Sequence, residues 1–260
     1  MDSGAVREGL TDEVVATLER MVQFCRILEI EGQGDRTLGF GSVRDPHGKG
    51  FWIKRSQIAL GEVVDHRDFF HIGLDGKIYS GEGRCHGEWV IHAAIFARRP
   101  DIMALAHTHP VYGCIVSASA EPMRPVGYRA TFFPKPPPRY EGSSELITKL
   151  EVADRVADVM GDHFAVFLRN HGVVFGGTSI EHALVIGTSL EEACRDHLLA
   201  TSSNMPWMWA PDAEQARKIT GQERNLRPFL DYYCRKLARA EAAGHPTLAR
   251  DRVPVPQPKR

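Results

Sequence analysis

The 260-residue sequence lacks the features that mark several specialised classes of protein. It has no large excess of charge, because 32 basic residues balance 33 acidic ones, so we expect no field that would hold nucleic acid or an anionic membrane. No uninterrupted apolar run approaches the roughly 20 residues that cross a bilayer. Residues 1–9 are polar and acidic and have no apolar centre, so we expect no secretory signal.

Cysteine is also scarce and scattered. The five cysteines are odd in number and form no Cys-x-x-Cys pair, which argues against a disulfide scaffold or a zinc knuckle and predicts a cytoplasmic protein. A composition of 43% hydrophobic and 25% charged residues is ordinary for a globular chain. We predict a single domain over residues 1–246, followed by a disordered tail rich in proline and arginine over residues 247–260.

The spacing of apolar residues predicts a mixture of helices and strands. Helices are expected at 11–31, 87–98, 111–118, 146–160 and 179–200. Strands are expected at 38–43, 50–54, 69–74, 77–79, 102–106, 164–168 and 173–175. The Asp75-Gly76 pair predicts a tight hairpin between two of these strands. Because strand-helix-strand units do not repeat evenly, we predict an α/β fold with a mixed, mainly antiparallel sheet flanked by helices.

Two histidines stand at the end of the apolar strand expected at 102–106. His107 and His109 are two residues apart, so in an extended chain their side chains point to the same side, and Pro110 ends the strand. Neutral imidazole is a common ligand for zinc, manganese and iron. Such a pair alone is more commonly a polar strand edge, so it does not by itself establish a metal site.

Three further residues strengthen the case for a metal. His171 lies in a polar turn between two short apolar strands, and Glu88 and His92 are one helical turn apart on one helix face. The rest of that helix is apolar, so it is expected to be buried, and a buried glutamate is costly unless it is paired or bound to metal. Three histidines and a carboxylate are typical of a catalytic metal site that keeps a position open for substrate.

These residues, in this order, resemble the signature of the class II aldolase/adducin family. The resemblance is carried by Glu88 and His92, by His107-Thr108-His109-Pro110 and by Asn170-His171-Gly172, and it extends over most of residues 15–200. It implies a three-layer α/β/α fold in a homotetramer with active sites between subunits.

The resemblance also implies roles for individual residues. His107, His109 and His171 would bind one divalent ion per chain, with zinc or manganese preferred over iron or cobalt. Glu88 would serve as both a ligand and an acid/base group, with His92 as a second catalytic candidate.

The sequence departs from the sugar-phosphate aldolases of this family where they bind phosphate. A phosphate cradle needs small residues that let backbone N–H groups close around the anion. Phe40 and Gln57 occupy such positions here, so we do not expect a phosphorylated sugar as substrate.

Other residues near these positions suggest a carboxylate substrate instead. Arginine suits two-point binding of a carboxylate, although a basic strand end can simply face water. The expected substrate-binding residues are Arg55, Ser56, Arg84, His86 and Tyr232. Several of these segments are similar to a subgroup that decarboxylates hydroxylated aromatic or pyridine dicarboxylates.

We therefore expect a metal-dependent lyase that decarboxylates a hydroxylated aromatic or heteroaromatic acid, with the substrate's hydroxyl and carboxylate chelated to the ion. Glu88 or His92 would return the proton. Three alternatives stay open. They are an aldolase or epimerase on an unphosphorylated hydroxy-carbonyl compound, a non-haem iron oxygenase on an aromatic acid, and a metal-free binding module as in adducin. The intact ligand set argues against the last.

Overall fold

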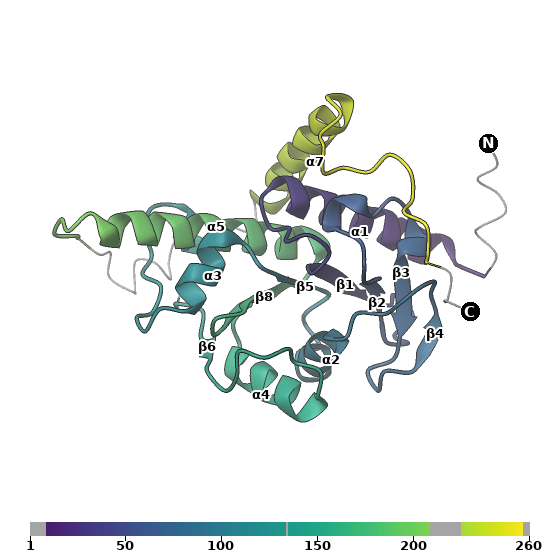
Figure 1. The fold of residues 1–260 in the computed structure, drawn as a ribbon, viewed down its shortest axis with the longest axis horizontal. Helices are drawn as coiled ribbons and strands as arrows, with labels where there is room; N and C mark the ends of the chain where they lie inside the picture. Colours follow the sequence, from purple (N-terminus) through teal and green to yellow (C-terminus); the bar gives the residue numbers. More distant parts are fainter. Residues whose placement is uncertain (1–8, 134, 209–224, 257–260) are drawn as a thin grey trace.

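The computed structural model describes residues 9–133, 135–208 and 225–256. Its centre is one eight-stranded sheet with the strand order β4-β3-β2-β1-β5-β8-β7-β6 (Figure 1). The strands are β1 (Phe40–Arg44), β2 (Phe51–Lys54), β3 (Phe69–Ile72), β4 (Ile78–Ser80), β5 (Ala104–Thr108), β6 (Arg139–Tyr140), β7 (Ala165–Leu168) and β8 (Gly172–Gly177). Among the described strands only β6 and β7 pair in parallel, so the predicted mixed, mainly antiparallel sheet is confirmed.

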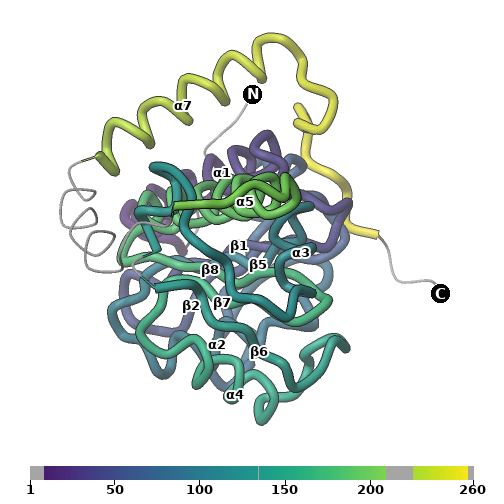
Figure 2. Tube along the Cα trace, turned by 90° about the vertical axis from the view of Figure 1, so that its left-hand side faces the viewer, coloured from purple at the N-terminus to yellow at the C-terminus, as the bar shows by residue number. Residues whose placement is uncertain are grey.

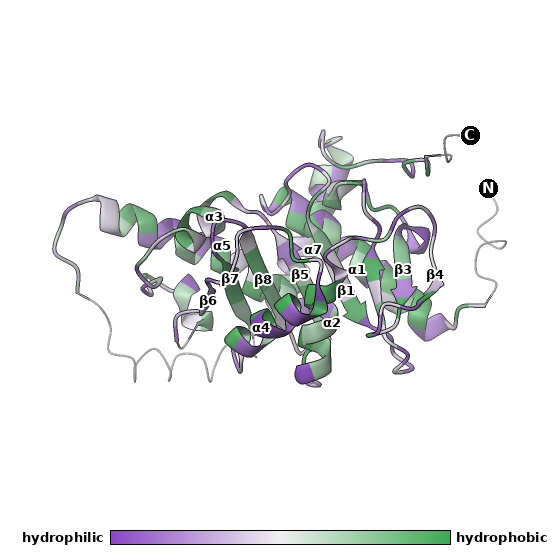
Figure 3. Ribbon diagram, turned by 60° about the horizontal axis from the view of Figure 1, so that its bottom comes forward, coloured by the Kyte–Doolittle hydropathy of each residue, from purple (hydrophilic) through white to green (hydrophobic). Residues whose placement is uncertain are grey.

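Helices cover both faces of this sheet, which gives the predicted three layers (Figure 2). One face packs against α1 (Asp12–Ile30), α3 (Val111–Ser117) and α5 (Ile180–Ser202), and the other packs against α2 (Trp89–Arg98) and α4 (Leu150–Met160). Helix α7 (Leu226–Ala242), which the sequence did not lead us to predict, lies outside α1 and α5. Apolar residues are concentrated in the central strands between the helical layers (Figure 3).

The alternation of side chains along β5 determines which face carries the site. Ala104 and Ala106 belong to the core on the α1 and α5 side, whereas Leu105 belongs to the core on the α2 and α4 side. His107 therefore lies on the α2 side, and Thr108 lies on the opposite side.

The starts of two helices differ from the prediction, and Glu88 is involved in both. The helix expected from 146 begins at Leu150, since the N–H of Ile147 donates to the carboxylate of Glu88 (2.8 Å). The helix expected from 87 begins at Trp89, with Glu88 at its N-cap position. In contrast, Thr11 and Ser179 cap α1 and α5 where the sequence predicts their starts, because each side chain accepts a backbone N–H.

The segment after α7 differs from the predicted disordered tail. Residues 247–256, here called the C-terminal strap, lie against the body of the protein: Leu248 is 8% exposed within the core, and the N–H of Ala249 donates to the carbonyl of Gly61 (3.0 Å). The proline- and arginine-rich composition predicted disorder. The contacts that hold this segment could not be predicted locally, because its partners are distant in sequence. The last predicted tail residues, 257–260, lie outside the described residues. Among the helices described, none combines the length and apolar character needed to span a membrane.

Candidate active site

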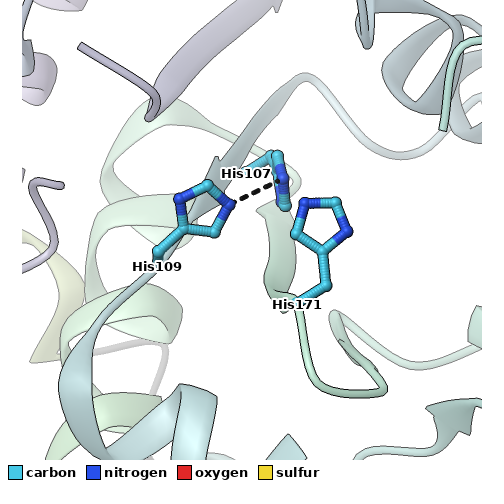
Figure 4. Close-up of side chains that lie close together, drawn as sticks. All are labelled: His107, His109 and His171. Atoms are coloured by element: carbon cyan, nitrogen blue, oxygen red, sulfur yellow. Dashed lines mark hydrogen bonds between the residues drawn. The ribbon is translucent and has the colours of Figure 1, made fainter. Parts of the chain in front are cut away.

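Three histidines from two segments come together at one end of the central strands (Figure 4). His107 is the penultimate residue of β5, His109 follows the strand, and His171 lies in the turn between β7 and β8. The Nε2 atoms of His107 and His109 are 3.2 Å apart, and one nitrogen from each of the three rings lies within 4.8 Å of the others. The structure thus places together the three residues that the sequence predicted as ligands, here called the histidine triad.

The turn that carries His171 depends on its neighbours. Asn170 adopts a left-handed conformation (φ 54°), which asparagine tolerates better than most residues. Gly172 has no room for a side chain, because a Cβ there would lie 2.5 Å from His109 Cδ2 and 2.5 Å from the carbonyl oxygen of Thr108. The close approach of these two chain segments therefore requires the glycine of the Asn-His-Gly run.

One hydrogen bond and one electrostatic contact on the far side of the rings orient two of the histidines. His107 Nδ1 lies 3.0 Å from the carbonyl oxygen of Val173. A carbonyl can only accept, so Nδ1 carries the proton and Nε2 presents its lone pair to the site. His109 Nδ1 lies 3.5 Å from Asp35 Oδ2, which is an electrostatic contact without hydrogen-bond geometry. Sequence reasoning missed Asp35, because nothing in the pattern of the loop after α1 links it to the histidines.

Glu88 supplies the carboxylate beside the triad, as predicted. Its two oxygens lie 3.7 Å from His107 Nε2 and 3.8 Å from His171 Nε2, and the side chain is largely buried. Burial raises the pKa of Glu88 to about 6, opposed by the hydrogen bond from the Ile147 N–H. The carboxyl group therefore holds a proton at higher pH than an exposed glutamate does.

The donor set fits a divalent cation. Burial lowers the pKa of all three triad histidines, to about 4 for His171, so the rings are neutral and can offer lone pairs. Both ring nitrogens of His171 are buried without a hydrogen-bond partner among the described residues. An unsatisfied buried polar group costs about 1–3 kcal/mol, so an ion at this position would remove a real penalty. Three imidazoles and one carboxylate suit zinc, manganese or iron.

An aromatic wall adjoins the triad on the α2 side of the sheet. The ring of Phe40 lies with its centroid 4.1 Å from that of His86, 4.7 Å from that of His92 and 5.5 Å from that of His107. His92 is fully buried, and its Nδ1 is 2.6 Å from Ser42 Oγ. Burial lowers the pKa of His86 and His92 to about 3, so both rings are neutral. The predicted residues His86 and His92 thus share one apolar surface with the triad.

Two of the predicted substrate residues already have other partners. Arg55 is 2% exposed, its Nε donates to Asp68 Oδ1 (2.9 Å), and its Nη2 donates to the carbonyl of Val253. Ser56 donates through Oγ to the carbonyl of Arg84 (3.0 Å), which ties the segment after β2 to the one before Glu88. The side chain of Arg84 is exposed. In this chain Arg55 pairs with the buried Asp68. We had predicted that Arg55 binds a carboxylate of the substrate.

Tyr232 lies away from the triad. It is 47% exposed on α7 and lines a cavity of about 480 Å³ together with Tyr128, Phe132 and Phe229. None of the triad histidines lines this cavity. Within the described part of one chain, Tyr232 therefore does not join the site.

Comparisons with known proteins agree with this fold. Residues 19–198 match the family model described as the Class II Aldolase and Adducin N-terminal domain, so the chain belongs to this family. A structure of an aldolase II superfamily protein from Pseudomonas syringae superposes with a TM-score of 0.80 at 26% identity, covering 91% of this chain and 98% of that one.

Two curated relatives carry more specific descriptions. One is the 4-hydroxy-3-prenylphenylpyruvate oxygenase/4-hydroxy-3-prenylbenzoate synthase of Streptomyces roseochromogenus subsp. oscitans, which is 31% identical over 83% of this chain and 77% of its own. Another is the decarboxylase NovR of Streptomyces niveus, which is 33% identical over 66% of this chain and 64% of its own. The family and its aldolase and decarboxylase members indicate a lyase.

Proposed function

We propose that this protein decarboxylates a hydroxylated aromatic or heteroaromatic carboxylic acid, using a divalent ion held by the histidine triad and Glu88. The observation that carries the proposal is the aromatic wall. Phe40 is fully buried and packs against His86, His92 and His107, so an apolar layer lies directly behind the candidate ligands. These surroundings suit an aromatic acid better than a phosphorylated sugar, because the bulky ring of Phe40 leaves no backbone cradle for a phosphate group.

The loop after β2 supports the same conclusion. Gln57 has a left-handed backbone (φ 67°) at a position where a phosphate-binding turn would use a small residue. A decarboxylase and a prenylbenzoate synthase among the relatives also support an aromatic acid as the substrate class.

The residues of the chain then have distinct tasks. A divalent ion bound at the triad would supply Lewis-acid withdrawal of electrons from the substrate. Phe40 packs behind His86, His92 and His107 and holds these rings in place, and the buried surroundings exclude water. Glu88 Oε1 accepts the Ile147 N–H (2.8 Å), so Oε2 is the oxygen that would either bind the ion or, once substrate takes its place there, carry a proton. As the bond to the carboxylate breaks, carbon dioxide leaves, the electron pair stays on the ring carbon, and that carbon takes the proton of Glu88.

His92 is the second candidate for this proton transfer. It is held by Ser42 and lies one helical turn from Glu88, but its ring is neutral at working pH. We assign the proton to Glu88 because its carboxyl group lies against the candidate ligands, 3.7 Å from His107 Nε2 and 3.8 Å from His171 Nε2, where a chelated substrate would lie.

Aldol cleavage of an unphosphorylated hydroxy-carbonyl compound is the second candidate function. It is favoured by the family membership and would use the same carboxyl group of Glu88. Oxygenation of an aromatic acid is suggested only by the description of one relative.

The homotetramer with active sites between subunits stays a proposal, as does the cytoplasmic location. Exposed apolar side chains near the triad support a subunit contact there: Val111 is 64% exposed and Ile115 is 51% exposed on α3, and Leu146 is 70% exposed beside the Glu88 partner Ile147. Such a grouping of large apolar side chains is typical of a surface that another chain covers.

The test combines elemental analysis of the purified protein with a carbon dioxide release assay on a panel of hydroxylated aromatic and pyridine carboxylic acids. We expect about one divalent ion per chain and release that a chelator abolishes. Glu88→Gln should retain the fold and lose release by at least about a hundredfold. Metal without release from any acid, but with aldehyde formed from a hydroxy-carbonyl compound, would establish the aldolase instead. Absence of bound metal would refute both lyase mechanisms.

A further inference from the structure

A cavity of about 800 Å³ lies between α1, α7 and the C-terminal strap, and the proposed function does not account for it. Neither the triad histidines nor Glu88 line it. In Figure 2, α7 is the outermost helix above α1, and the chain that follows α7 returns along the body of the protein. Cavities of about 300–1,000 Å³ are typical of small-molecule sites.

The turn after α7 forms one wall of this cavity. Gly244 has a left-handed backbone (φ 67°), and the N–H of His245 donates to the carbonyl of Ala240 (2.9 Å), so the chain reverses direction there. The strap that follows is held by the buried Leu248 and by the backbone hydrogen bond of Ala249. The cavity is therefore preformed, because backbone hydrogen bonds and core packing fix this wall.

Arg26 is a buried cation in the opposite wall, with a side chain that is 10% exposed. Its Nε donates to Glu241 Oε1 (2.9 Å). Its Nη1 donates at 3.2, 3.1 and 3.0 Å to the carbonyls of Gly61, Val63 and Ala249. Its Nη2 has no acceptor among the described residues and is not one of the buried atoms that lack a partner, so it reaches open space. Because the cavity is open space that Arg26 borders, this nitrogen is available to an acceptor on a ligand.

The lining of the cavity has an excess of positive charge. Among the described lining residues Glu241 is the only carboxylate, and its ion pair with Arg26 offsets its charge. Arg250 also lines the cavity and forms no ion pair with a described residue. Its Nη2 lies over Gly244, where an added Cβ would be 3.2 Å away. Two guanidinium groups with one paired carboxylate favour an anion, and a guanidinium suits the oxygens of a carboxylate.

The rest of the lining is mainly aliphatic. Phenylalanine, tyrosine and tryptophan are absent from the described lining residues, so an aromatic ligand would find no ring to stack on. An aliphatic chain gains from each CH₂ group that it buries. The aliphatic side chains are those of Val22, Val64, Leu237, Ala238 and Leu248.

We propose that this cavity binds an aliphatic monocarboxylate, with the carboxylate group at Arg26 and near Arg250 and the chain against the aliphatic side chains. The site is separate from the histidine triad and does not depend on the proposed function. Because one ligand contacts both α7 and the C-terminal strap, binding stabilises the two segments against local opening.

The experiment measures ligand binding to the full-length, zinc-loaded protein by titration calorimetry. The probes are octanoate, octanamide, which has the chain without the charge, and acetate, which has the charge without the chain and also reports any binding to zinc. We expect octanoate to bind at least about tenfold more tightly than either of the others. Hydrogen exchange of the wild type should slow in residues 234–250 when octanoate is bound.

A pair of variants tests the charge. Arg26 holds α1 to the strap, so its removal could prevent folding, whereas Arg250 is exposed and carries no such contact. Arg250→Met should weaken octanoate by about three- to tenfold and leave octanamide unchanged. Arg239→Met, an exposed residue of α7 outside the lining, should bind octanoate as the wild type does.

Three results would overturn the proposal. They are equal affinity for octanoate and octanamide, unchanged octanoate affinity in Arg250→Met, and protection from exchange confined to the triad segments instead of residues 234–250. The wild-type measurements do not depend on the folding of any variant. None of these results bears on the proposed function, which the carbon dioxide assay tests separately.

Discussion

Two clusters of polar side chains in the described part of the chain, each centred on buried groups, differ in one respect. The first is the histidine triad with Glu88. The second, here called the arginine cluster, consists of Arg55, Asp68, Glu82 and Arg252. In the arginine cluster, Asp68 is fully buried and accepts from Arg55 Nε (2.9 Å) and Arg252 Nε (2.8 Å), and Arg252 also donates to Glu82 (2.8 Å) and to the carbonyl of Arg67 (2.8 Å).

The difference is whether the buried groups are satisfied within the chain. The arginine cluster completes its own hydrogen bonds, so its charges are used for structure. The site beside α2 leaves nitrogens of His171, His86 and His92 without partners among the described residues, so it is prepared for groups from outside. Burial and charge alone do not separate a structural cluster from a functional one, because both clusters are buried and both contain ionisable groups. Four substitutions test this distinction.

The largest effect is expected from removing a triad histidine. His107→Ala should lower zinc affinity by about a thousandfold or more, because a site of three or four ligands shares a total of about 10–16 kcal/mol. Equilibrium dialysis with metal analysis measures this. His71→Ala, at a histidine stacked on Trp52 at the other end of the sheet, should bind zinc as the wild type does. Unchanged zinc affinity in His107→Ala would show that the triad is not a metal site.

Removing the anion of the arginine cluster should lower the free energy of unfolding and leave zinc affinity unchanged. Asp68→Ala leaves Arg55 buried at 2% exposure without its counter-charge, and we expect the free energy of unfolding to fall by about 3–5 kcal/mol. Denaturant titration measures the loss. Asp231→Ala breaks the exposed pair with Arg227 and should change stability by less than about 1 kcal/mol. Equal effects of the two substitutions would contradict a structural role for the buried cluster.

A smaller effect is expected where the chain packs against the triad. In Gly172→Ala the added Cβ meets His109 and the carbonyl of Thr108 at 2.5 Å, so His109 must shift, and zinc affinity should fall by about 10- to 100-fold. Gly87→Ala is the control, since a Cβ there meets only Thr148, at 3.9 Å. If Gly172→Ala bound zinc normally, the turn would not position the triad.

The smallest effect is expected in the C-terminal strap. Arg252→Met removes one of the two arginines on Asp68 but leaves Arg55 in place, and Glu82 is half exposed, so we expect a loss of about 1–2 kcal/mol. Hydrogen exchange should also increase in residues 81–87, because Glu82 lies in this loop. The exposed Arg227→Met serves as the control. Unchanged exchange in 81–87 would show that the strap does not hold the loop that leads to His86 and Glu88.

The same comparison explains which predictions from sequence succeeded. The two-residue spacing of His107 and His109 on a strand fixes their relative direction, so their meeting could be predicted locally. The place of Glu88 beside them followed from the family resemblance and from its setting on an apolar helix. Arg55 was predicted to bind substrate, because its partners Asp68 and Val253 are distant in sequence and no local pattern reveals them.

The sequence by itself determined the alternation of strands and helices, the family and the candidate ligands, because these depend on spacing and residue type. Tertiary structure alone decided which buried groups find partners. It brought Asp35 to His109, Thr37 to His86 and the C-terminal strap to Asp68, each across a long stretch of chain. The physical reason is that hydrogen-bond satisfaction depends on contacts between segments that are remote in sequence, whereas periodicity depends only on neighbours along the chain.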